Sequence, residues 1–311
     1  MSKRIGVIDI GTNTARLAVF DCRDTGARTP IVRHSEITRL GQGVNRNRRL
    51  DPEAVKRTLD VMDRYVEQAR ELGAHPLCGV GTSALRDAGD AQDFVDAIRA
   101  RGVDFKVVAG AAEARLVFAG AATAFDARDS GPVLVIDVGG GSTELIRGAG
   151  AVFEKVASLD IGAVRMTERF MPHSPAHQAD LQRMESFMKT AFQAVAADFA
   201  PGPGGHAAAV GGTISTLAAL HLRGWDPDRV HGVDLSLERI ESLYGTLRGM
   251  SSEQIADLPG MEPRRADIIT AGTAVYVVLL RAFGLHGVRV SLHDIRHGVC
   301  EAVIGGSWNK L

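Results

Sequence analysis

The sequence predicts an α/β protein built from two similar lobes, and three observations lead to this expectation. Apolar segments of strand length alternate with longer periodic segments typical of helices, which is the pattern of an α/β layer architecture. The segments RIGVIDIGTNTARLAVF (residues 4–20) and VLVIDVGGGSTELI (133–146) each place an aspartate and a glycine-rich polar turn between two apolar strands. A length of 311 residues favours two domains over one. We therefore expect a duplicated unit, with the second copy beginning near residue 126.

Composition and charge limit the classes of function. The net charge is −1, so no overall field favours nucleic acid or a membrane, and an anionic substrate would need a local cationic pocket. The 3 cysteines, Cys22, Cys78 and Cys300, show no paired spacing, which favours a reducing cytoplasm. The first residues lack the pattern of a signal peptide, and the apolar run at 274–280 is too short to span a bilayer. We expect a cytoplasmic protein with neither a nucleic-acid nor a membrane partner.

The first lobe is expected to open with a three-stranded meander and to continue with alternating helices and strands. Asp51 and Pro52 mark the start of a helix, because aspartate caps a helix and proline fits its first position, and Gly73 marks the end. In chain order we expect strands at 5–10, 15–20 and 30–40, a helix at 51–72, a strand at 77–80, a helix at 90–101, a strand at 105–108 and a helix at 111–124.

The second lobe is expected to repeat the meander and then to be mostly helical. PGPGG at 201–205 is typical of a turn, and the glycines at 211 and 212 open a helix. After the second hairpin we expect strands at 151–158 and 207–210, and helices at 176–199, from 211, at 236–249, at 263–283 and at 296–304.

The two polar turns are candidates for phosphate binding. Glycine lets backbone amides approach an oxyanion closely, and GTNT (11–14) and GGGST (139–143) add hydroxyl and amide side chains. Asp9 and Asp137 precede these turns. A carboxylate beside a phosphate is repulsive unless a cation bridges the two, and Mg²⁺ is commonly held in this way. One such hairpin alone would be an ordinary β-turn, but the matched pair favours phosphate binding. A third glycine turn (211–213) precedes a helix whose free amides suit an anion.

The chain resembles the exopolyphosphatase/guanosine pentaphosphate phosphohydrolase (Ppx/GppA) family, within the actin–hexokinase–heat-shock protein superfamily, over essentially its whole length. The most specific segments are IDVGGGSTEL (136–145) and the EARL of GAAEARLVFAGA (110–121). Others follow in family order: DIGTNTARL (9–17), RLGQGV (39–44), GTSALRDA (81–88), VGGTISTLAAL (210–220), RRADIITAG (264–272) and DIRHG (294–298). Departures are Thr14 where serine is common, Ala109 for the usual serine, and Ala112 for an acidic residue, which leaves Glu113 as the one glutamate there.

This resemblance implies two ribonuclease H-like (actin-like ATPase) lobes with an interdomain cleft, in the short two-domain form of the family. The lobes would span residues 1–125 and 126–295, with a C-terminal helix at about 296–311 packing back on the first lobe. It also implies a homodimer.

The resemblance further assigns roles to individual residues. Glu113 is implied as the catalytic carboxylate that orients or deprotonates the attacking water; without the resemblance it would be a surface residue near a helix start. Asp137, Glu144 and, at longer range, Asp9 are implied as ligands of Mg²⁺, or of Mn²⁺ in its place. The implied phosphate-binding residues are Gly11, Thr12, Asn13, Arg16, Arg86, Gly140, Gly141, Ser142, Thr143, Gly211, Gly212 and Thr213.

Two further groups of residues allow a functional or a neutral interpretation. Arg46, Arg48, Arg49, Arg264, Arg265 and Arg296 could form a cationic track for a long polyanion, although charge clusters are usually solvated surface. His173 and His177 have a spacing found in metal sites. Pro172 and Pro175 break helical geometry there, so we expect exposed loop histidines.

The leading expectation is a Mg²⁺-dependent exopolyphosphatase, a phosphoric anhydride hydrolase that releases orthophosphate from inorganic polyphosphate. The same residues suit guanosine pentaphosphate, the nearest alternative. An aromatic content of 5% and the lack of an obvious stacking cluster for guanine favour polyphosphate. A superfamily kinase or a non-catalytic sensor of polyphosphate or an alarmone fits less well, because the acidic set is complete and no kinase signature is present.

Overall fold

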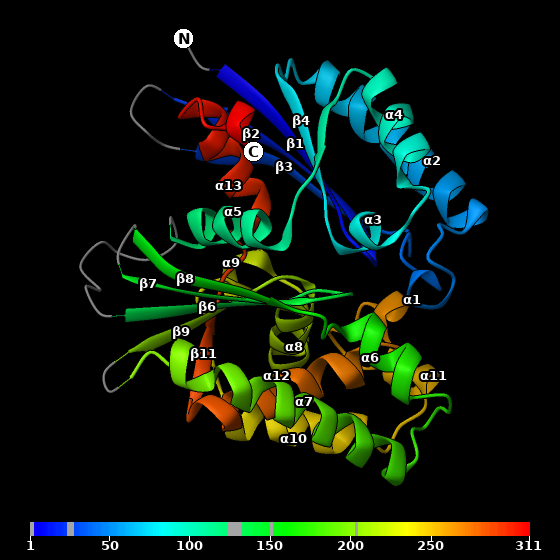
Figure 1. The fold of residues 1–311 in the computed structure, drawn as a ribbon, viewed down its shortest axis with the longest axis vertical. Helices are drawn as coiled ribbons and strands as arrows, with labels where there is room; N and C mark the ends of the chain where they lie inside the picture. The colour runs from blue at the N-terminus through cyan, green and yellow to red at the C-terminus, as the bar shows by residue number, and fades with distance from the viewer. Residues whose placement is uncertain (1–2, 24–27, 123–131, 150–151, 203–204) are drawn as a thin grey trace. The chain divides into compact units, whose positions relative to one another are not determined.

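The computed structural model of the protein describes residues 3–23, 28–122, 132–149, 152–202 and 205–311. Backbone contacts divide the chain into two compact units (Figure 1): Met1–Gly120 with Ile295–Leu311 form unit 1, and Ala121–Asp294 forms unit 2. The boundary expected at 125/126 lies outside the described residues, as do the turn residues 203–204 and the last two residues of the helix expected at 111–124. The cleft expected between the two units stays a prediction.

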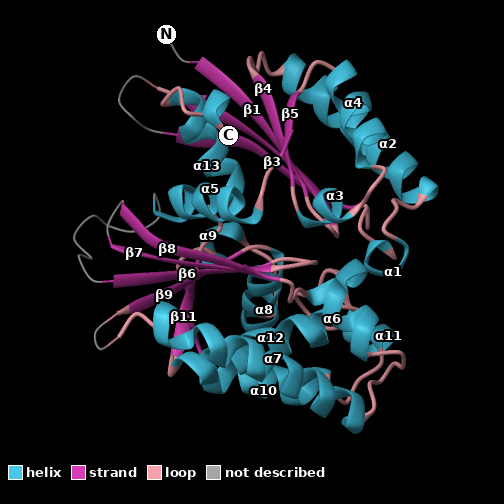
Figure 2. Ribbon diagram, viewed as in Figure 1, coloured by secondary structure: helices cyan, strands magenta, loops and turns pink. Residues whose placement is uncertain are grey.

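Unit 1 contains a mixed five-stranded sheet in the order β3-β2-β1-β4-β5. The meander β1–β2–β3 is antiparallel, whereas β4 and β5 run parallel to β1. Figure 2 shows α2 and α4 along one face of this sheet, with α5 and α13 on the other. The elements are β1 (Lys3–Ile10), β2 (Thr14–Cys22), β3 (Arg28–Ile37), α1 (Val44–Asn47), α2 (Pro52–Glu71), β4 (Leu77–Gly81), α3 (Ser83–Asp87), α4 (Ala91–Ala100), β5 (Asp104–Val107), α5 (Gly110–Ala122), α13 (Ile295–Ile304) and a final 3-10 turn (Trp308–Lys310).

Unit 2 contains a six-stranded sheet in the order β10-β11-β9-β6-β7-β8. Its meander β6–β7–β8 is again antiparallel, and β9 and β11 again run parallel to the first strand. The elements are β6 (Pro132–Val138), β7 (Thr143–Ala149), β8 (Val152–Leu159), α6 (Ala163–Phe170), α7 (Gln178–Phe199), β9 (His206–Val210), α8 (Gly212–Leu222), α9 (Pro227–Val230), β10 (Asp234–Ser236), α10 (Leu237–Leu247), α11 (Ser252–Ala256), a 3-10 turn (Pro263–Arg265), α12 (Ile269–Phe283) and β11 (Gly287–Val290).

The two sheets share one topology, which confirms the predicted duplication. The order β3-β2-β1-β4-β5 in unit 1 corresponds to β8-β7-β6-β9-β11 in unit 2, where β10 is an added edge strand. The α/β class with two related lobes is therefore confirmed. In parallel and mixed α/β sheets, ligands bind beyond the carboxyl ends of the strands. The loops after β1, β4 and β5, and those after β6, β9 and β11, are thus the places to look for a site.

Local sequence signals explain the helix boundaries. The Asp51 side chain accepts a hydrogen bond from the Ala54 amide at 2.9 Å, Pro52 occupies the first position of α2, and Gly73, at φ 67°, follows its end, as predicted. In α11, Ser251 and Gln254 form a reciprocal capping box.

Two expectations about the last third of the chain need correction. The region after α8 was expected to be mostly helical, and it also contributes the strands β10 and β11 to the sheet. These strands have 3 and 4 residues, too few to show a period of two. The helix expected at 263–283 is split into a 3-10 turn and α12.

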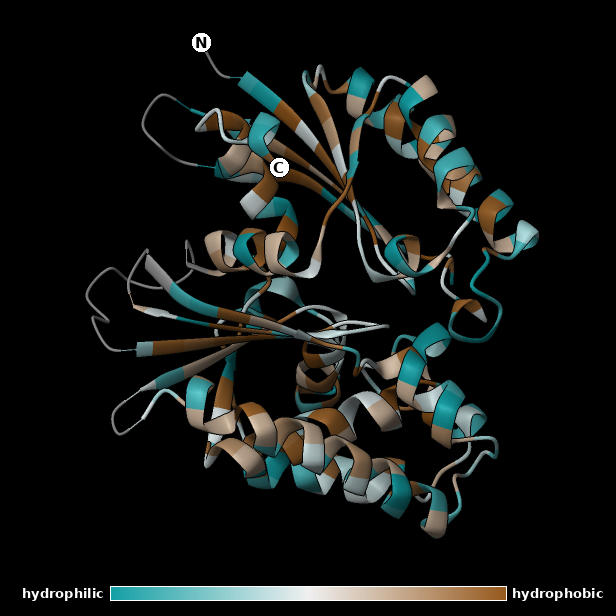
Figure 3. Ribbon diagram, viewed as in Figure 1, coloured by the Kyte–Doolittle hydropathy of each residue, from teal (hydrophilic) through white to brown (hydrophobic). Residues whose placement is uncertain are grey.

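Each unit has its own apolar core. In unit 1 the core fills the space between the sheet and α2 and α4, with Ile8, Leu17 and Met62 fully buried. In unit 2 it surrounds α12, whose residues are almost all buried. Figure 3 shows the hydrophobic colouring concentrated on the strands and on the helix sides that face them. None of the helices in the described part of the chain is both long enough and apolar enough to cross a bilayer.

The contact of α13 with α5 in unit 1 generates the first prediction. A Cβ atom on Gly298 of α13 would lie 1.8 Å from the Leu116 carbonyl oxygen of α5. We expect Gly298→Ala to force these helices apart and to lower the free energy of unfolding by about 1–3 kcal/mol, the usual cost of overpacking. The midpoint of urea denaturation measures this change.

Gly245→Ala is the matched control. Gly245 also lies inside a helix, α10, but a Cβ there meets no neighbouring atom within 4 Å. The control should stabilise the protein by about 0.5–1 kcal/mol, because alanine loses less backbone entropy than glycine. Equal effects of the two substitutions would contradict the assigned close contact.

Candidate active site

The first glycine-rich turn of unit 1 joins β1 to β2 and is fixed by the segment that follows β3. The Gly11 amide donates to the Thr14 carbonyl at 2.9 Å, and the amides of Thr38 and Arg39 both donate to the Asn13 carbonyl at 3.0 Å. The Gly41 amide donates to the Thr12 carbonyl at 2.9 Å. Because a trans peptide directs its C=O and N–H to opposite sides, the Asn13 amide points away from this supporting segment.

Asn13 also carries an unsatisfied donor. Its side-chain Nδ2 is buried and has no hydrogen-bond partner in the structure. A buried donor without an acceptor is costly and needs an explanation. A phosphate oxygen at this turn would supply the acceptor, which is consistent with the predicted role of Asn13.

Asp9 lies at the end of β1, directly opposite Arg16 on β2. Asp9 is 4% exposed, and Arg16 Nη1 lies 3.2 Å from its Oδ2. The predicted metal ligand Asp9 and the predicted phosphate ligand Arg16 are therefore an ion pair in unit 1. This pair neutralises a charge that would otherwise be buried next to the turn.

Glu113 lies in the first turn of α5, after the carboxyl end of β5, and is 7% exposed. Arg86, which follows β4, donates from Nη1 to Glu113 Oε2 at 2.5 Å and to the Val108 carbonyl at 2.9 Å. The pKa of Glu113 is raised to about 7: burial is the largest cause, the Arg86 guanidinium acts against it, and the nearby Asp9 adds to the increase. A carboxylate with a pKa near neutrality is suited to general base catalysis.

This contact changes the interpretation of Arg86. The sequence predicted a phosphate-binding arginine, but one of its guanidinium nitrogens is bound to Glu113 and to the backbone at Val108. The described geometry supports a positioning role toward Glu113. Its binding of phosphate stays a prediction.

The glycine-rich turn of unit 2 joins β6 to β7 and repeats the geometry of the first. The Gly139 amide donates to the Ser142 carbonyl at 2.9 Å, as the Gly11 amide does to Thr14. The amino end of α6 binds the carbonyls of this turn. The Ala163 amide donates to the Gly139 carbonyl at 2.9 Å, and the amides of Val164 and Arg165 both donate to the Gly140 carbonyl, at 2.9 and 3.0 Å. Arg165 Nε also donates to the Gly141 carbonyl at 2.6 Å.

The peptide geometry then orients the amides of this turn. With the carbonyls of residues 139–141 directed toward α6, the amides of Gly140, Gly141 and Ser142 point to the opposite side. Successive amides directed the same way form an anion-binding concavity. Gly162 permits this arrangement, because a Cβ there would lie 2.4 Å from the Gly140 carbonyl oxygen.

Asp137 and Glu144 flank this turn and lie directly opposite each other on β6 and β7. Directly opposed residues point to the same face of the sheet with their Cβ atoms about 4.5–5.5 Å apart. Glu144 is 1% exposed, and Ser158 Oγ on β8 donates to its Oε1 at 2.8 Å. Two neighbouring carboxylates offer the oxygen ligands that Mg²⁺ prefers, so the residues present fit this ion.

The third glycine turn, at 211–213, brings the amino end of α8 next to Asp137 in unit 2. Gly211 has φ 91°, a left-handed conformation that glycine adopts readily, and a Cβ there would lie 2.3 Å from Asp137 Oδ1. The carboxylate of Asp137 therefore lies against the amino end of α8. The guanidinium of Arg265 packs over the next residue, since a Cβ on Gly212 would lie 2.5 Å from its Nη1.

Two predicted phosphate ligands use their hydroxyls inside the fold. Thr143 Oγ1 donates to the Ile161 carbonyl at 2.5 Å, and Thr213 Oγ1 donates to the Val138 carbonyl at 2.9 Å. Both side chains are buried and tie the ends of β6 and β7 to neighbouring segments. Any phosphate binding by these two residues would fall to their backbone amides.

One candidate for the cationic track is buried in unit 1. Arg296 is 8% exposed, and its Nη1 donates to the Leu17 carbonyl on β2. It therefore anchors α13 to the sheet of unit 1, which does not favour its candidate role in a cationic track. Arg49 is exposed and pairs with Asp90 at 3.1 Å.

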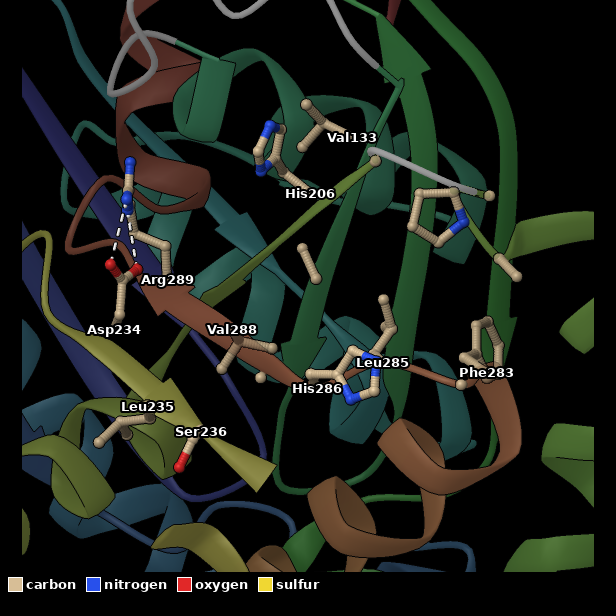
Figure 4. Close-up of a pocket in the computed structure, with 17 residues that line it drawn as sticks. Val133, His206, Asp234, Leu235, Ser236, Phe283, Leu285, His286, Val288 and Arg289 are labelled. Carbon is tan, nitrogen blue, oxygen red and sulfur yellow. Dashed lines mark hydrogen bonds and ion pairs between the residues drawn. The ribbon is translucent and has the colours of Figure 1, made fainter. Parts of the chain in front are cut away.

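A cavity of about 750 Å³ lies elsewhere in unit 2 (Figure 4). Its lining includes Val133, His206 and Gly287, at the amino ends of β6, β9 and β11, and the Asp234–Arg289 ion pair at one side. None of the predicted site residues lines it. Since ligands of such sheets bind at the carboxyl ends of the strands, we do not assign the catalytic site to this cavity.

Comparison with known proteins identifies the class. The model of the Ppx/GppA phosphatase family matches residues 19–304, so the chain belongs to this family and is a phosphatase by class. Exopolyphosphatase 2 of Mycobacterium tuberculosis is 33% identical over 97% of this chain and 99% of the relative. Exopolyphosphatase 1 of Mycobacterium leprae is 27% identical over 95% of this chain and 88% of the relative.

Solved structures agree with this assignment. The Ppx/GppA family member from Aquifex aeolicus superposes with a TM-score of 0.83 at 30% identity, over 98% of this chain and 99% of that chain. An exopolyphosphatase from Cytophaga hutchinsonii gives a TM-score of 0.89 at 26% identity, covering 98% of each chain. The two-lobed α/β fold of the family is thus also the fold of this chain.

Sequence reasoning missed the residues that hold the second turn. Gly162 and Arg165 both lie in the segment DIGAVR (160–165): Arg165 binds the Gly141 carbonyl of the turn, and Gly162 lies against the Gly140 carbonyl. Two signals were present: a second Asp-Ile-Gly triplet and a glycine directly before a helix. Ser158, which binds Glu144, gave no signal, because a strand serine has no special pattern.

The Glu113–Arg86 pair generates the second prediction. Arg86 acts to lower the pKa of Glu113, so Arg86→Gln should raise that pKa above its wild-type value of about 7. A general base works when deprotonated, so kcat/KM for phosphate release rises with pH through this pKa. The rising limb should therefore move to higher pH by about one unit or more in the variant.

The measurement is kcat/KM against pH for wild type and variant on one substrate, so that the titration of the substrate itself cancels. Arg64→Gln is the control, because it removes one positive charge from an exposed ion pair of unit 1, Arg64–Glu36. A limb that stays in place in Arg86→Gln, or that moves equally in both variants, argues against Glu113 as the titrating base.

Proposed function

We propose that the protein is a Mg²⁺-dependent exopolyphosphatase that hydrolyses the terminal phosphoanhydride bond of inorganic polyphosphate and releases orthophosphate. The observation that carries the proposal is a buried glutamate, Glu113, with a pKa of about 7, at the carboxyl edge of the unit 1 sheet. Relatives named exopolyphosphatase, such as that of Mycobacterium tuberculosis, support the choice of substrate.

In the proposed reaction Glu113 accepts a proton from the attacking water as the water oxygen bonds to the terminal phosphorus. The bridging P–O bond breaks, and the shortened polyphosphate leaves with the bridging oxygen. Phosphoryl transfer depends more on positioning and charge neutralisation than on covalent catalysis. Arg86 would hold the carboxylate in the orientation needed for proton transfer.

The amides of Gly140, Gly141 and Ser142 would bind oxygens of the terminal phosphates. Asp137 and Glu144 would hold Mg²⁺, which, when bound, neutralises charge on the phosphate oxygens. Ser158 fixes Glu144, and the contact with Gly211 places Asp137.

Guanosine pentaphosphate is the second candidate substrate, because the family model itself covers both kinds of phosphatase. The chemistry at the terminal phosphate would be the same, so the residues assigned above serve either substrate. An enzyme for guanosine pentaphosphate must bind a guanosine next to the reacting phosphates, whereas an enzyme for polyphosphate must bind further phosphates there. We place polyphosphate first because of the relatives' names and the low aromatic content of 5%.

A parallel assay tests the proposal. Phosphate release from long polyphosphate, short polyphosphate and guanosine pentaphosphate is measured at equal concentration of terminal phosphate, with and without Mg²⁺. We expect the highest kcat/KM on polyphosphate and little release without Mg²⁺. A higher kcat/KM on guanosine pentaphosphate would select the second candidate. ATP-dependent transfer to acetate, glycerol or sugars, without phosphate release, would indicate a kinase.

Glu113→Gln provides the third prediction. The amide keeps the shape of the side chain and an acceptor for Arg86 but cannot take up the proton. We expect kcat to fall by about 10²–10⁴-fold, the usual contribution of a general base, with substrate binding retained. Glu238→Gln, at an exposed position in the first turn of α10, is the control for the loss of one carboxylate. Unchanged turnover in Glu113→Gln would refute the assigned role.

Asp137→Asn provides the fourth prediction. The substitution removes one anionic ligand while preserving the shape of the side chain against Gly211. We expect the Mg²⁺ concentration for half-maximal activity to rise by about tenfold or more. Asp228→Asn, at an exposed position in α9, makes the same change in charge. A metal titration that matches wild type would remove Asp137 from the metal site.

A further inference from the structure

The loop that joins α6 to α7 in unit 2 carries a group of metal-ligating side chains remote in sequence from the predicted Mg²⁺ ligands. Among the described residues, His173, His177 and Asp180 place their potential ligand atoms within 4.8 Å of one another. Both histidines are exposed, as the sequence predicted, whereas Asp180 is 6% exposed. We propose that His173, His177 and Asp180 form a binding site for Zn²⁺ or a similar transition-metal ion.

The backbone fixes two of these ligands relative to each other. His177 is the N-cap residue of α7 and its side chain makes no cap hydrogen bond, while its carbonyl accepts from the Asp180 amide at 3.0 Å. The N-cap and third helical positions lie on one side of the first turn. His177 and Asp180 are therefore held side by side by the start of the helix itself.

The two oxygens of Asp180 have different surroundings. Arg183, one turn further along α7, pairs with Oδ1. The other oxygen, Oδ2, lies 4.0 Å from His177 Nδ1. The arginine thus fixes the orientation of the carboxylate and leaves Oδ2 directed toward the histidine.

His173 completes the group from the loop. Its ring stacks on that of His177, with centroids 4.1 Å apart and an interplanar angle of 25°. The loop is anchored at the next residue, because Ser174 Oγ accepts from the Ser252 amide at 2.8 Å and lies 3.0 Å from Ser252 Oγ. His173 also borders a cavity of about 180 Å³ that is lined by Met171, Leu247 and Met250 among others. The backbone at His173 is therefore attached to the rest of unit 2.

The ligand chemistry selects the ion. Imidazole suits Zn²⁺, Co²⁺ or Ni²⁺, whereas Mg²⁺ prefers oxygen ligands throughout. Two histidines and one carboxylate leave the fourth tetrahedral position of Zn²⁺ to water. Ligands at 2.0–2.1 Å from Zn²⁺ lie about 3.3 Å apart, so separations of up to 4.8 Å must shorten by up to about 1.5 Å. Both rings are exposed and can make this adjustment by side-chain rotation.

The ion would join the loop of 171–177 to the start of α7. The amino end of a helix is its positive end and works against a cation, but the buried carboxylate of Asp180 opposes this effect. We therefore expect weaker binding than at a closed site of four protein ligands. The expected consequence is a Zn²⁺-dependent increase in the thermal stability of the protein.

The test uses the whole, untagged protein with Mg²⁺ in excess, so that the carboxylates assigned to Mg²⁺ are occupied. Titration with Co²⁺, the spectroscopic substitute for Zn²⁺, should give tetrahedral d–d absorption bands at one equivalent. Zn²⁺ should displace the Co²⁺ and raise the melting temperature. The single variants His173→Ala and His177→Ala and the variant Asp180→Asn should each weaken binding by more than about tenfold. The double variant His173→Ala/His177→Ala should abolish the bands.

His206→Ala is the control, since His206 is an exposed histidine of the same unit at the start of β9. It should bind Co²⁺ as wild type does. Circular dichroism and retained phosphate release report that the variants fold. Wild-type bands and affinity in the folded double variant would overturn the proposal, as would the absence of any saturable Co²⁺ binding to the wild-type protein.

Discussion

The contact between Arg86 and Glu113 is the interaction on which the proposed chemistry depends. Burial alone would drive the carboxyl of Glu113 to its neutral form, and a neutral acid cannot accept a proton from water. The guanidinium at 2.5 Å opposes burial, and the resulting pKa of about 7 keeps the group able to switch at neutral pH. Asp9 acts in the other direction, but its carboxylate is paired with Arg16 at 3.2 Å. Two arginines of unit 1 thus balance two buried carboxylates at the edge of one sheet.

The glycine-rich turns follow a second constraint, that the carbonyls of a buried loop must be hydrogen-bonded. In unit 1 the amides of Thr38, Arg39 and Gly41 bind the carbonyls of Thr12 and Asn13. In unit 2 the amino end of α6 binds those of Gly139 and Gly140. Satisfying the carbonyls on one side directs amides to the other. The same hydrogen bonds that stabilise the turns therefore make them suited to an anion.

Several segments that carry the family resemblance hold the site residues in place rather than supply site residues themselves. RLGQGV at 39–44 supplies amides to the first turn, and Gly298 of DIRHG allows α13 to approach the backbone of α5, the helix that bears Glu113. Thr143 and Thr213 use their hydroxyls to join neighbouring segments of unit 2. A substitution in these segments would alter the site by displacing the turns and the helix that bear its residues.

The sequence by itself determined the α/β class, the duplicated hairpins and the helix that starts at Asp51, because these depend on local periodicity, capping and turn residues. It also placed Asp137 and Glu144 at the two ends of one turn, from which their direct opposition on β6 and β7 follows. It did not show β11, since four residues carry no readable period and this strand exists only through its pairing with β9 and β10. Tertiary structure alone decided that Arg86 binds Glu113 across 27 residues of chain, that Arg296 is buried, and that Asp180 lies beside two exposed histidines. These contacts join segments whose local patterns are independent, and only packing decides which charged groups meet.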